Sequence, residues 1–213
     1  MANENEKRAA AEAAALLVED GMTVGLGTGS TVAPLLPALA ARGLTLRCVA
    51  TSPATEKTAA ALGLSVEPFG SIERFDITID GADQITPDGW LIKGGGAAHT
   101  REKIVAAATD RFVVIADSSK PVDRLQPAVP VELLAFGLAS TLRRLPDVEL
   151  RDVPISPDGG VIADYRGPID NPERLAAILS GIPGVIEHGL FEPSLTADIL
   201  IARGDSVEHR RLR

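Results

Sequence analysis

The chain has 213 residues, enough for one large or two small domains with a buried core. Its composition, 45% hydrophobic and 23% charged, is typical of a globular protein, whereas a formal net charge of −8 and 3% aromatic residues argue against a nucleic-acid partner, which needs a basic surface and stacking side chains. A single cysteine, Cys48, excludes an intrachain disulfide and a multi-cysteine metal site, and the three histidines show no metal-ligand spacing.

The first half of the chain alternates between helical and strand patterns. Residues 7–21 form an alanine-rich helical pattern that ends at Gly21, and the helix at 52–63 has Ser52 as its cap and Pro53 in its first turn. The expected helices span 7–21, 30–43, 52–63 and 97–109, and the expected strands span 22–27, 44–50, 64–68, 76–80, 90–93 and 111–117. Because these strands are near-continuous apolar runs, the pattern predicts an α/β fold with a mostly parallel, Rossmann-like sheet and helices on both faces.

The second half has a different order of elements. Strands are expected at 128–134, 148–153, 159–165 and 185–191, and helices at 135–146 and 171–184. This β-α-β-β-α-β order predicts a smaller ferredoxin-like α+β domain. Residues 197–204 then form one more strand, which we expect to return to the first sheet before a polar, solvated tail. The predicted domains are 1–127 with 197–213 for catalysis, and 128–196 as a lid or oligomerisation domain.

The N-terminal ten residues contain no apolar stretch of the kind that forms a signal peptide. No window approaches the ~20 apolar residues of a membrane span. The sequence therefore predicts a soluble, cytoplasmic protein without a membrane partner.

Four unusual loops directly follow strand candidates: GTGST at 27–31, DGAD at 80–83, KGGG at 93–96 and DSSK at 117–120. Ligands of open parallel sheets bind outside the carboxyl ends of the strands. If the four strands are parallel neighbours, all four loops meet at one edge and form one ligand site.

The segment GLGTGST combines flexible glycines with the hydroxyl groups of Thr28, Ser30 and Thr31 before a helix expected to begin near Val32. A helix N-terminus with such donors favours an anion. The segment lacks the third glycine of a dinucleotide fingerprint and the Gly-Lys-Ser/Thr of a Walker loop, so a small phosphate monoester is the better candidate. A tight turn with a helix cap is the alternative.

Asp80 and Asp83 flank a turn at the end of a buried strand. Turn chemistry alone would explain one of them. Two carboxylates at a candidate ligand edge favour hydrogen bonds to a polyhydroxylated substrate. Asp76 begins the strand at its opposite end and is expected to be structural.

The segment KGGGAAHTREK carries the most chemistry. The amides of Gly94–Gly96 and the charge of Lys93 suit a developing oxyanion, and Glu102 in the following helix suits proton abstraction next to a carbonyl. Glu102 as a simple helix-start residue is the alternative, and His99 is either a second candidate base or a partly exposed helix residue. Lys120 is a candidate phosphate or hydroxyl contact, or a surface cation.

Taken together, GLGTGST, TEK, DITIDGAD, IKGGGAAHTREK and VVIADSSK resemble the type A family of ribose-5-phosphate isomerases in order and spacing, over nearly the whole chain. The resemblance implies interconversion of D-ribose 5-phosphate and D-ribulose 5-phosphate through a cis-enediol, in the non-oxidative pentose phosphate pathway, without cofactor or metal, by a homodimer or homotetramer. It implies that Glu102 is the proton acceptor. The residues it implies for the phosphate end and the sugar site, with further basic contacts, are Thr28, Gly29, Ser30, Thr31, Asp80, Gly81, Ala82, Asp83, Lys93, Gly94, Gly95, Gly96, Lys120 and Lys7. Gln84 and His99 depart from the pattern of many relatives.

Two other functions remain open at this stage. The first is a non-catalytic sugar-phosphate sensor on the same fold, because a fold does not fix a function. A sensor that controls transcription would need a DNA-reading module, which is not visible, and it would not need Lys93 with Glu102. The second is an isomerase for a related aldose phosphate.

Overall fold

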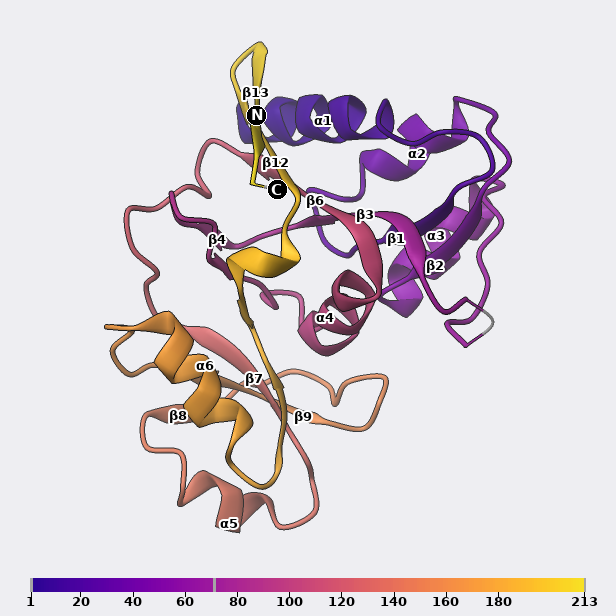
Figure 1. Ribbon diagram of the computed structural model, residues 1–213. Coiled ribbons are helices and arrows are strands. Elements are labelled where there is room, and N and C mark those ends of the chain that lie inside the picture. Colours follow the sequence, from indigo (N-terminus) through magenta and orange to yellow (C-terminus); the bar gives the residue numbers. More distant parts are fainter. Residues whose placement is uncertain (1, 71, 213) are drawn as a thin grey trace. The chain divides into compact units, whose positions relative to one another are not determined.

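The computed structural model describes residues 2–70 and 72–212 (Figure 1). The chain divides into two compact units. Unit 1 comprises Met1–Ala82, Arg101–Lys120 and Ser194–Arg213, and unit 2 comprises Asp83–Thr100 and Pro121–Pro193. Unit 2 thus includes residues 83–100, which the sequence-based division assigned to the first domain; the predicted domain boundaries stay a prediction.

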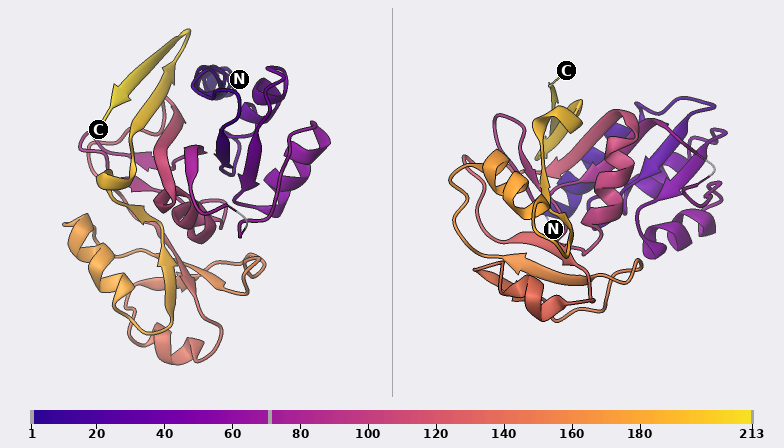
Figure 2. Two further views of the ribbon diagram at one scale, coloured as in Figure 1. Left: turned by 45° about the vertical axis from the view of Figure 1, so that its right-hand side comes forward. Right: turned by 60° about the horizontal axis from the view of Figure 1, so that its bottom comes forward.

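Unit 1 contains a six-stranded sheet in the order β13-β12-β6-β3-β1-β2 (Figures 1 and 2). Every neighbouring pair is parallel except β12 with β13. The strands are β1 Thr23–Leu26, β2 Arg47–Ala50, β3 Phe75–Gly81, β6 Thr109–Asp117, β12 Asp198–Arg203 and β13 Ser206–Arg211. The helices are α1 Ala2–Ala15, α2 Leu35–Ala40, α3 Pro53–Ala61 and α4 His99–Ala107. The predicted mostly parallel sheet is confirmed, and so is the return of residues 197–204 to it.

Side chains of alternate strand residues separate the two faces of this sheet. Ile77 and Ile79 of β3 pack in the cluster that contains α1 and α2, whereas Thr78 Oγ1 and Val105 Cγ1 of α4 both lie within 3 Å of the Cβ position of Gly25 in β1. Because successive residues of a strand point to opposite faces, Thr78 and Asp80 lie on the face that α4 covers. Helices therefore cover both faces, as predicted (Figures 1 and 2).

Two elements of unit 1 are shorter than the sequence suggests. The helix expected at 30–43 is reduced to α2, because Pro34 and Pro37 lack the amide N–H of a regular helix and Pro34 stands at its N-cap. The strand expected at 64–68 makes only an isolated bridge between Val66 and Cys48. The predicted cap of α3 is confirmed, since the Ser52 side chain accepts a hydrogen bond from the Thr55 amide.

The prediction of a solvated C-terminal tail is wrong. Residues 206–211 form β13, which pairs along its length with β12. Asp198 holds this hairpin to the sheet: it accepts hydrogen bonds from Arg111 Nε at 2.7 Å and pairs with His209 Nε2 at 2.6 Å. Charged side chains are usual on an edge strand, where they discourage pairing with other chains. The polar sequence of residues 206–211 is therefore compatible with a strand at the edge of the sheet.

Unit 2 contains a four-stranded antiparallel sheet in the order β10-β7-β9-β8. Its strands are β7 Val129–Leu133, β8 Val148–Leu150, β9 Val161–Tyr165 and β10 Val185–His188, and its helices are α5 Leu138–Leu142 and α6 Pro172–Ser180. If the four strands are numbered by their order in the chain, they lie side by side across the sheet as 4-1-3-2. This is the predicted ferredoxin-like arrangement. Asn171 caps α6 by accepting from the Arg174 amide at 2.8 Å.

The rest of unit 2 holds a small sheet in the order β11-β5-β4. Its strands are β4 Gln84–Ile85, β5 Leu91–Ile92 and β11 Leu190–Phe191, and a short 3-10 helix, η1, spans Pro193–Leu195. The strand expected at 185–191 is therefore two strands in two sheets, separated at Gly189. The Gly189 amide donates to the carbonyl of Pro130 at 2.7 Å, and its own carbonyl accepts from the Lys93 amide at 2.9 Å.

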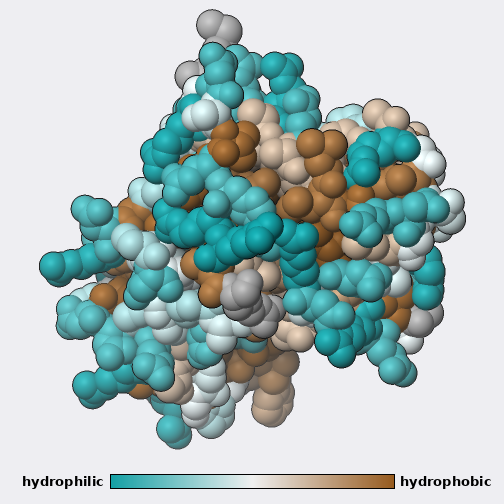
Figure 3. Space-filling model, turned by 45° about the horizontal axis from the view of Figure 1, so that its top comes forward, coloured by the Kyte–Doolittle hydropathy of each residue, from teal (hydrophilic) through white to brown (hydrophobic). Residues whose placement is uncertain are grey.

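The surface of the protein mixes polar and apolar side chains. Figure 3 shows the face that carries α1 and α2. Patches of hydrophobic residues lie on this face between hydrophilic ones. Along the described ranges, no helix combines the length and the apolar character that crossing a membrane would require.

We expect Asp198→Asn to destabilise the fold at pH 7 by about 1–3 kcal/mol, because a hydrogen-bonded charge is lost. Burial raises the pKa of Asp198, but the hydrogen bonds and charges of Arg111 and His209 outweigh burial and place that pKa below the ordinary range. A lowered pKa stabilises the folded state above about pH 4 and ceases to do so as the pH falls through the folded-state value. Urea unfolding at pH 7 and pH 3 should show a difference that shrinks at the lower pH.

The matched control for this prediction is Asp205→Asn in the exposed turn of the same hairpin. It should unfold like the wild type at both pH values. A gap between Asp198→Asn and wild type that stayed constant from pH 7 to pH 3 would contradict the charge-based explanation.

Candidate active site

Three of the four predicted loops follow neighbouring parallel strands of unit 1. Residues 27–31 follow β1, Asp80 lies at the end of β3, and residues 118–120 follow β6. The register pairs Leu26 with Ile79 and Gly81 with Ile115, so these loops lie at the same carboxyl edge. The fourth loop, 93–96, follows β5, which pairs with antiparallel neighbours in unit 2. The expectation that β5 belongs to the parallel sheet is wrong.

The loop after β1 packs directly on the carboxylate of Asp80. The Thr28 amide donates to Asp80 Oδ1 at 3.1 Å. A Cβ atom on Gly27 would lie 2.0 Å from the same oxygen, so only glycine allows the loop to approach this closely. Asp80 is fully buried. The loop and the first aspartate of DGAD, 52 residues apart in sequence, therefore form one polar cluster.

Threonine hydroxyls extend this cluster toward α3. Thr28 Oγ1 lies 2.8 Å from Thr51 Oγ1, and Thr55 Oγ1 donates to the Gly27 carbonyl at 3.0 Å. Sequence reasoning did not assign a role to Thr51 or Thr55. The signal that could have found them is the strand next to β1 at the same edge, β2: Thr51 directly follows it, and Thr55 lies in the first turn of α3, the next helix.

The N-terminal helix α1 brings a cation to the same loop. Lys7 Nζ donates to Ser30 Oγ at 3.1 Å and to Glu4 Oε1 at 2.8 Å. The neighbouring Glu6, which sequence reasoning missed, is 7% exposed and accepts hydrogen bonds from the Gly204 amide and from the amide and hydroxyl of Ser118. These bonds, that of Gly204 foremost, hold the pKa of Glu6 below its usual range. Glu6 thus ties α1 to the loops after β6 and β12.

The expected helix N-terminus behind residues 28–31 lies further along the chain. Helix α2 begins at Leu35, and residues 30–34 form turns. The prediction that a helix beginning near Val32 supplies a dipole for an anion is therefore wrong. The hydroxyls of residues 28–31 and the ammonium of Lys7 remain as donors. Thr31 is buried beside Gly81, whose Cβ position would be 3.5 Å from Thr31 Cβ.

Lys120 lies in the tight turn that follows β6. Asp117 Oδ1 accepts from the Ser119 amide at 2.9 Å, and the Lys120 amide donates to the Asp117 carbonyl at 3.2 Å. The side chain of Lys120 is half-buried. The turn therefore fixes the backbone of Lys120 at the carboxyl edge of the sheet.

Glu102 lies in the first turn of α4 and is 5% exposed. One turn later, Val105 packs so closely on β1 that a Cβ on Gly25 would lie 2.7 Å from its Cγ1. Residues three apart share a helix face, so Glu102 is on the face of α4 that faces the sheet. Asp80 is on the sheet face that α4 covers. The carboxylates of Asp80 and Glu102 therefore both lie in the layer between the sheet and α4.

Lys93 is held in unit 2 and is 2% exposed. Its amide donates to Gly189, and a Cβ on Gly189 would lie 2.1 Å from the Lys93 carbonyl. Its ammonium lies 5.4 Å from the centre of the Phe191 ring, which suits a cation. Gly189 therefore holds the backbone of Lys93, and Phe191 of β11 contacts its side chain.

The glycine triplet is only partly the set of free amides that the sequence suggested. The Gly95 amide donates to Asp83 Oδ2 at 2.8 Å, so the expectation that all three amides point at a ligand is wrong for Gly95. Gly94 has φ 105°, and a Cβ there would lie 2.7 Å from His99 Nδ1. His99 is fully buried, which rules out its reading as a partly exposed residue.

Gln84 has a structural position. Its side-chain amide donates to the Gln126 carbonyl at 2.9 Å, and its oxygen accepts from the Gln126 amide at 2.7 Å. Gln84 therefore binds the backbone of Gln126 through both atoms of its side-chain amide.

The predicted residues therefore form two groups. Unit 1 brings together Lys7, Thr28, Ser30 and Asp80, with Glu102 on the adjacent helix face. Unit 2 brings together Asp83, Lys93 and Gly94–Gly96. In the ranges 2–70 and 72–212, no three His, Cys, Asp or Glu side chains are placed to hold a metal ion.

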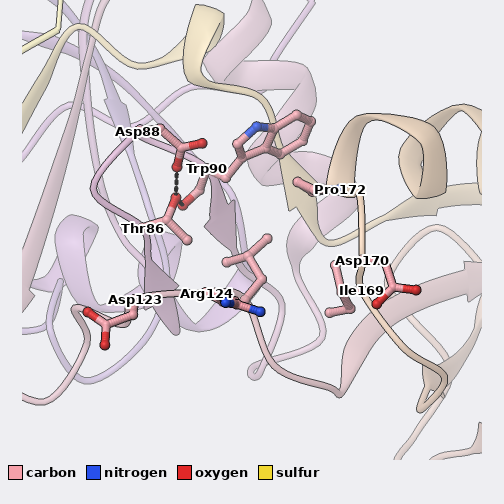
Figure 4. A pocket seen from close by; sticks show the side chains of 9 residues that line it. Thr86, Asp88, Trp90, Asp123, Arg124, Ile169, Asp170 and Pro172 are labelled. Carbon is pink, nitrogen blue, oxygen red and sulfur yellow. Dashed lines mark hydrogen bonds between the residues drawn. The ribbon is translucent and has the colours of Figure 1, made fainter.

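Unit 2 also contains a cavity of about 140 Å³ (Figure 4). Its lining includes the Trp90 ring, Arg124 and three carboxylates, and Thr86 donates to one of them, Asp88. The residues that line it are Thr86, Asp88, Trp90, Asp123, Arg124, Leu125, Ile169, Asp170 and Pro172. This cavity contains none of the predicted site residues.

The sheet, its polar carboxyl edge and the buried carboxylate on α4 define an α/β enzyme with a site for a small polar substrate. Residues 47–206 match the family described as ribose 5-phosphate isomerase A (phosphoriboisomerase A). The chain belongs to this family, and it is an isomerase. This membership decides against the non-catalytic sensor that the sequence left open.

Individual relatives agree with this placement. Ribose-5-phosphate isomerase A of Caulobacter sp. (strain K31) is 45% identical over 206 residues, which cover 90% of this chain and 91% of that protein. The crystal structure of ribose 5 phosphate isomerase A from Neisseria gonorrhoeae has a TM-score of 0.94 at 32% identity and covers 99% of this chain and 98% of its own. A D-ribose-5-phosphate isomerase solved in complex with phospho-erythronic acid has a TM-score of 0.93 at 32% identity, covering 99% of this chain and 100% of its own.

We expect Gly27→Ala to destabilise the protein by about 1–3 kcal/mol and to lower activity, because the added methyl group would force the loop away from Asp80. Thermal and urea unfolding measure the first effect, and a kinetic assay the second. Gly70→Ala is the control, since a Cβ there has no heavy atom within 4 Å. Equal stability of the two variants would show that the close approach is not a constraint.

Proposed function

We propose that the chain interconverts D-ribose 5-phosphate and D-ribulose 5-phosphate through a cis-enediol, with Glu102 as the base. The observation that carries this proposal is the buried position of Glu102, on the helix face next to the sheet layer that holds Asp80. A carboxylate that is screened from water can remove a weakly acidic proton next to a carbonyl. Membership of the isomerase family supports the choice of substrate.

The phosphate end of the substrate is assigned to the loop 28–31 with Lys7 and Lys120. Lys7 already donates to Ser30, so its ammonium is placed beside the loop hydroxyls. Gly29 has φ 108°, a conformation open to glycine, and a Cβ there would meet no heavy atom within 4 Å. Hydroxyl and ammonium donors on a loop with this freedom suit a phosphate monoester.

The reaction needs one acid/base pair for ring opening and one base for the proton transfer. Asp80 or Asp83 assists opening of the furanose ring. Glu102 then removes the C2 proton of the open aldose, while the O2 hydroxyl proton passes to O1 and Lys93 stabilises the enediolate charge. Glu102 returns its proton to C1. Because C1 and C2 are adjacent, one carboxylate serves both steps, and this chemistry requires no cofactor or metal.

The glycine loop contributes in a more limited way than the sequence suggested. Asp83 accepts from the Gly95 amide, which fixes the Asp83 carboxylate against the loop. In the proposed mechanism, Asp83 therefore has one oxygen for the loop and one for a sugar hydroxyl. The amides of Gly94 and Gly96 remain assigned to the sugar site, together with Gly81 and Ala82.

We expect Glu102→Gln to lower kcat about 10²–10⁴-fold with a modest change in KM, because glutamine keeps the shape but cannot accept the proton. The assay follows conversion of ribose 5-phosphate by purified protein in the presence of a chelator. Glu173→Gln is the matched control, since Glu173 occupies the first turn of α6 and is exposed. Normal turnover by Glu102→Gln would refute its role as the base. Parallel assays with related aldose phosphates test the alternative substrate.

We also propose that the chain forms a homodimer or homotetramer through unit 2. Large apolar side chains that remain at least two-fifths exposed are concentrated there: Leu134, Phe136, Leu150, Val153, Ile155, Ile178 and Ile186. An exposed apolar surface of this kind marks an association site. Leu150 and Ile186 lie on β8 and β10, the two edge strands of the antiparallel sheet. A cytoplasmic location is proposed with it.

Light scattering coupled to size-exclusion chromatography should give a mass of two or four chains for the wild type. We expect Phe136→Asp, at a side chain that is 88% exposed, to lower that mass without unfolding the protein. Leu16→Asp in unit 1, where the leucine is 73% exposed, is the control and should leave the mass unchanged. A monomeric wild type at assay concentrations would contradict the proposal.

A further inference from the structure

Arg151, which follows β8, contacts the glycine loop of unit 2 from the antiparallel sheet. Its Nη1 donates to the Gly94 carbonyl at 3.0 Å and to the Gly95 carbonyl at 3.1 Å. Its Nε donates to Asp164 Oδ2 at 3.0 Å, and its Nη2 pairs with Asp164 Oδ1. Asp164 lies on β9, so two strands of one sheet hold the guanidinium in place.

These contacts fix the direction of the loop amides. In a trans peptide the carbonyl of one residue and the amide N–H of the next point in opposite directions. With the Gly94 carbonyl on Arg151, the Gly95 amide points away from it, and this amide donates to Asp83. With the Gly95 carbonyl on Arg151, the Gly96 amide must also point away from the guanidinium. Arg151 therefore sets the orientation of the two peptide planes.

The chemistry of arginine matters at this position. One nitrogen serves two carbonyls while the other two serve one carboxylate, an arrangement that uses the planar fork of the guanidinium. A lysine ammonium offers a single nitrogen and cannot span the carboxylate and both carbonyls. The side chain of Arg151 is 19% exposed and that of Asp164 is 12% exposed, so solvent only partly screens the pair.

A second side chain of the same sheet holds the other end of the segment. Glu132 of β7 is 2% exposed and accepts hydrogen bonds from the hydroxyls of Thr100 and Ser156. A Cβ on Gly160 would lie 2.0 Å from Glu132 Oε1, which shows how closely β9 and its turn enclose this carboxylate. Thr100 precedes Glu102 by two residues in α4. The sheet therefore contacts the 94–100 segment at both ends, through Arg151 at Gly94 and Gly95 and through Glu132 at Thr100.

We propose that Arg151 is a positioning residue for the reaction, with Glu132 as the second anchor, and that the antiparallel sheet of unit 2 acts as a template for the 93–102 segment. This inference rests on the proposed function, because it assumes that the segment contacts the reacting carbons. Arg151 acts through the loop: it holds the Gly95 amide on Asp83, and it orients the Gly96 amide that the proposed mechanism assigns to the sugar site. The sheet then has a catalytic purpose besides association.

The test compares two inhibitors on Arg151→Lys and Arg151→Met. Phospho-erythronic acid carries a carboxylate where the substrate has its reacting carbonyl, whereas inorganic phosphate can occupy only the phosphate end. We expect kcat to fall about 10- to 100-fold, as for a displaced catalytic group, and the inhibition constant of phospho-erythronic acid to rise at least several-fold. The inhibition constant of inorganic phosphate and the pH profile of kcat/KM should not change.

Arg166→Met is the matched control, since Arg166 follows β9 and pairs with Glu149 through a side chain that is 53% exposed. It should leave all four quantities unchanged. Thr100→Val and Thr100→Ser test the second anchor. Only the valine variant loses the hydroxyl that donates a hydrogen bond to Glu132, so only this variant should lower kcat. Thermal unfolding of each variant separates this effect from a loss of folded protein.

The outcomes separate this inference from the proposed function. Wild-type protein that fails to convert ribose 5-phosphate would refute the proposed function. An active wild type with Arg151 variants of normal kcat would refute the positioning role alone. Equal rises in both inhibition constants would also refute it, because they would indicate a general distortion of the site rather than a misplaced loop.

Discussion

The approach of the β1 loop to the Asp80 carboxylate is the constraint on which unit 1 depends. Gly27 allows contact at a distance that excludes any side chain, and the Thr28 amide satisfies one carboxylate oxygen. The same strand needs Gly25 so that Val105, and with it helix α4, can pack close to the sheet. Gly27, directly after β1, therefore sets the position of the loop, and Gly25 within β1 sets how closely the helix that carries Glu102 packs on the sheet.

Much of this arrangement could be predicted because it is written locally. Most of the apolar strands, the Ser52 cap and the β-α-β-β-α-β order are properties of short windows, and the structure confirms them. The four unusual loops could also be found in the sequence, because aspartates and glycines at the ends of buried strands are unusual unless they have a structural or functional role. Their roles stay proposals, but three of the four loops are confirmed at the carboxyl edge of the sheet in unit 1.

The errors arise where distant backbone contacts decide the outcome. The tail became a strand because β12 offered an open edge, and Asp198 supplied a partner for His209. The strand at 185–191 was divided because Gly189 bonds to both Pro130 and Lys93. Glu6 and Arg151 were missed for the same reason: each acts on residues more than fifty positions away, and no local pattern distinguishes them from ordinary surface charges.

Charge explains how an acidic protein can serve an anionic substrate. The net charge is −8, yet the cations of the proposed site are placed individually: Lys7 by α1, Lys93 by β11 and Lys120 by the turn after β6. Arg151 differs from these, because Asp164 neutralises it and its remaining donors serve carbonyls. Because of this pairing, Arg151 orients the glycine loop, whereas the positive charges that attract the substrate are those of the three lysines.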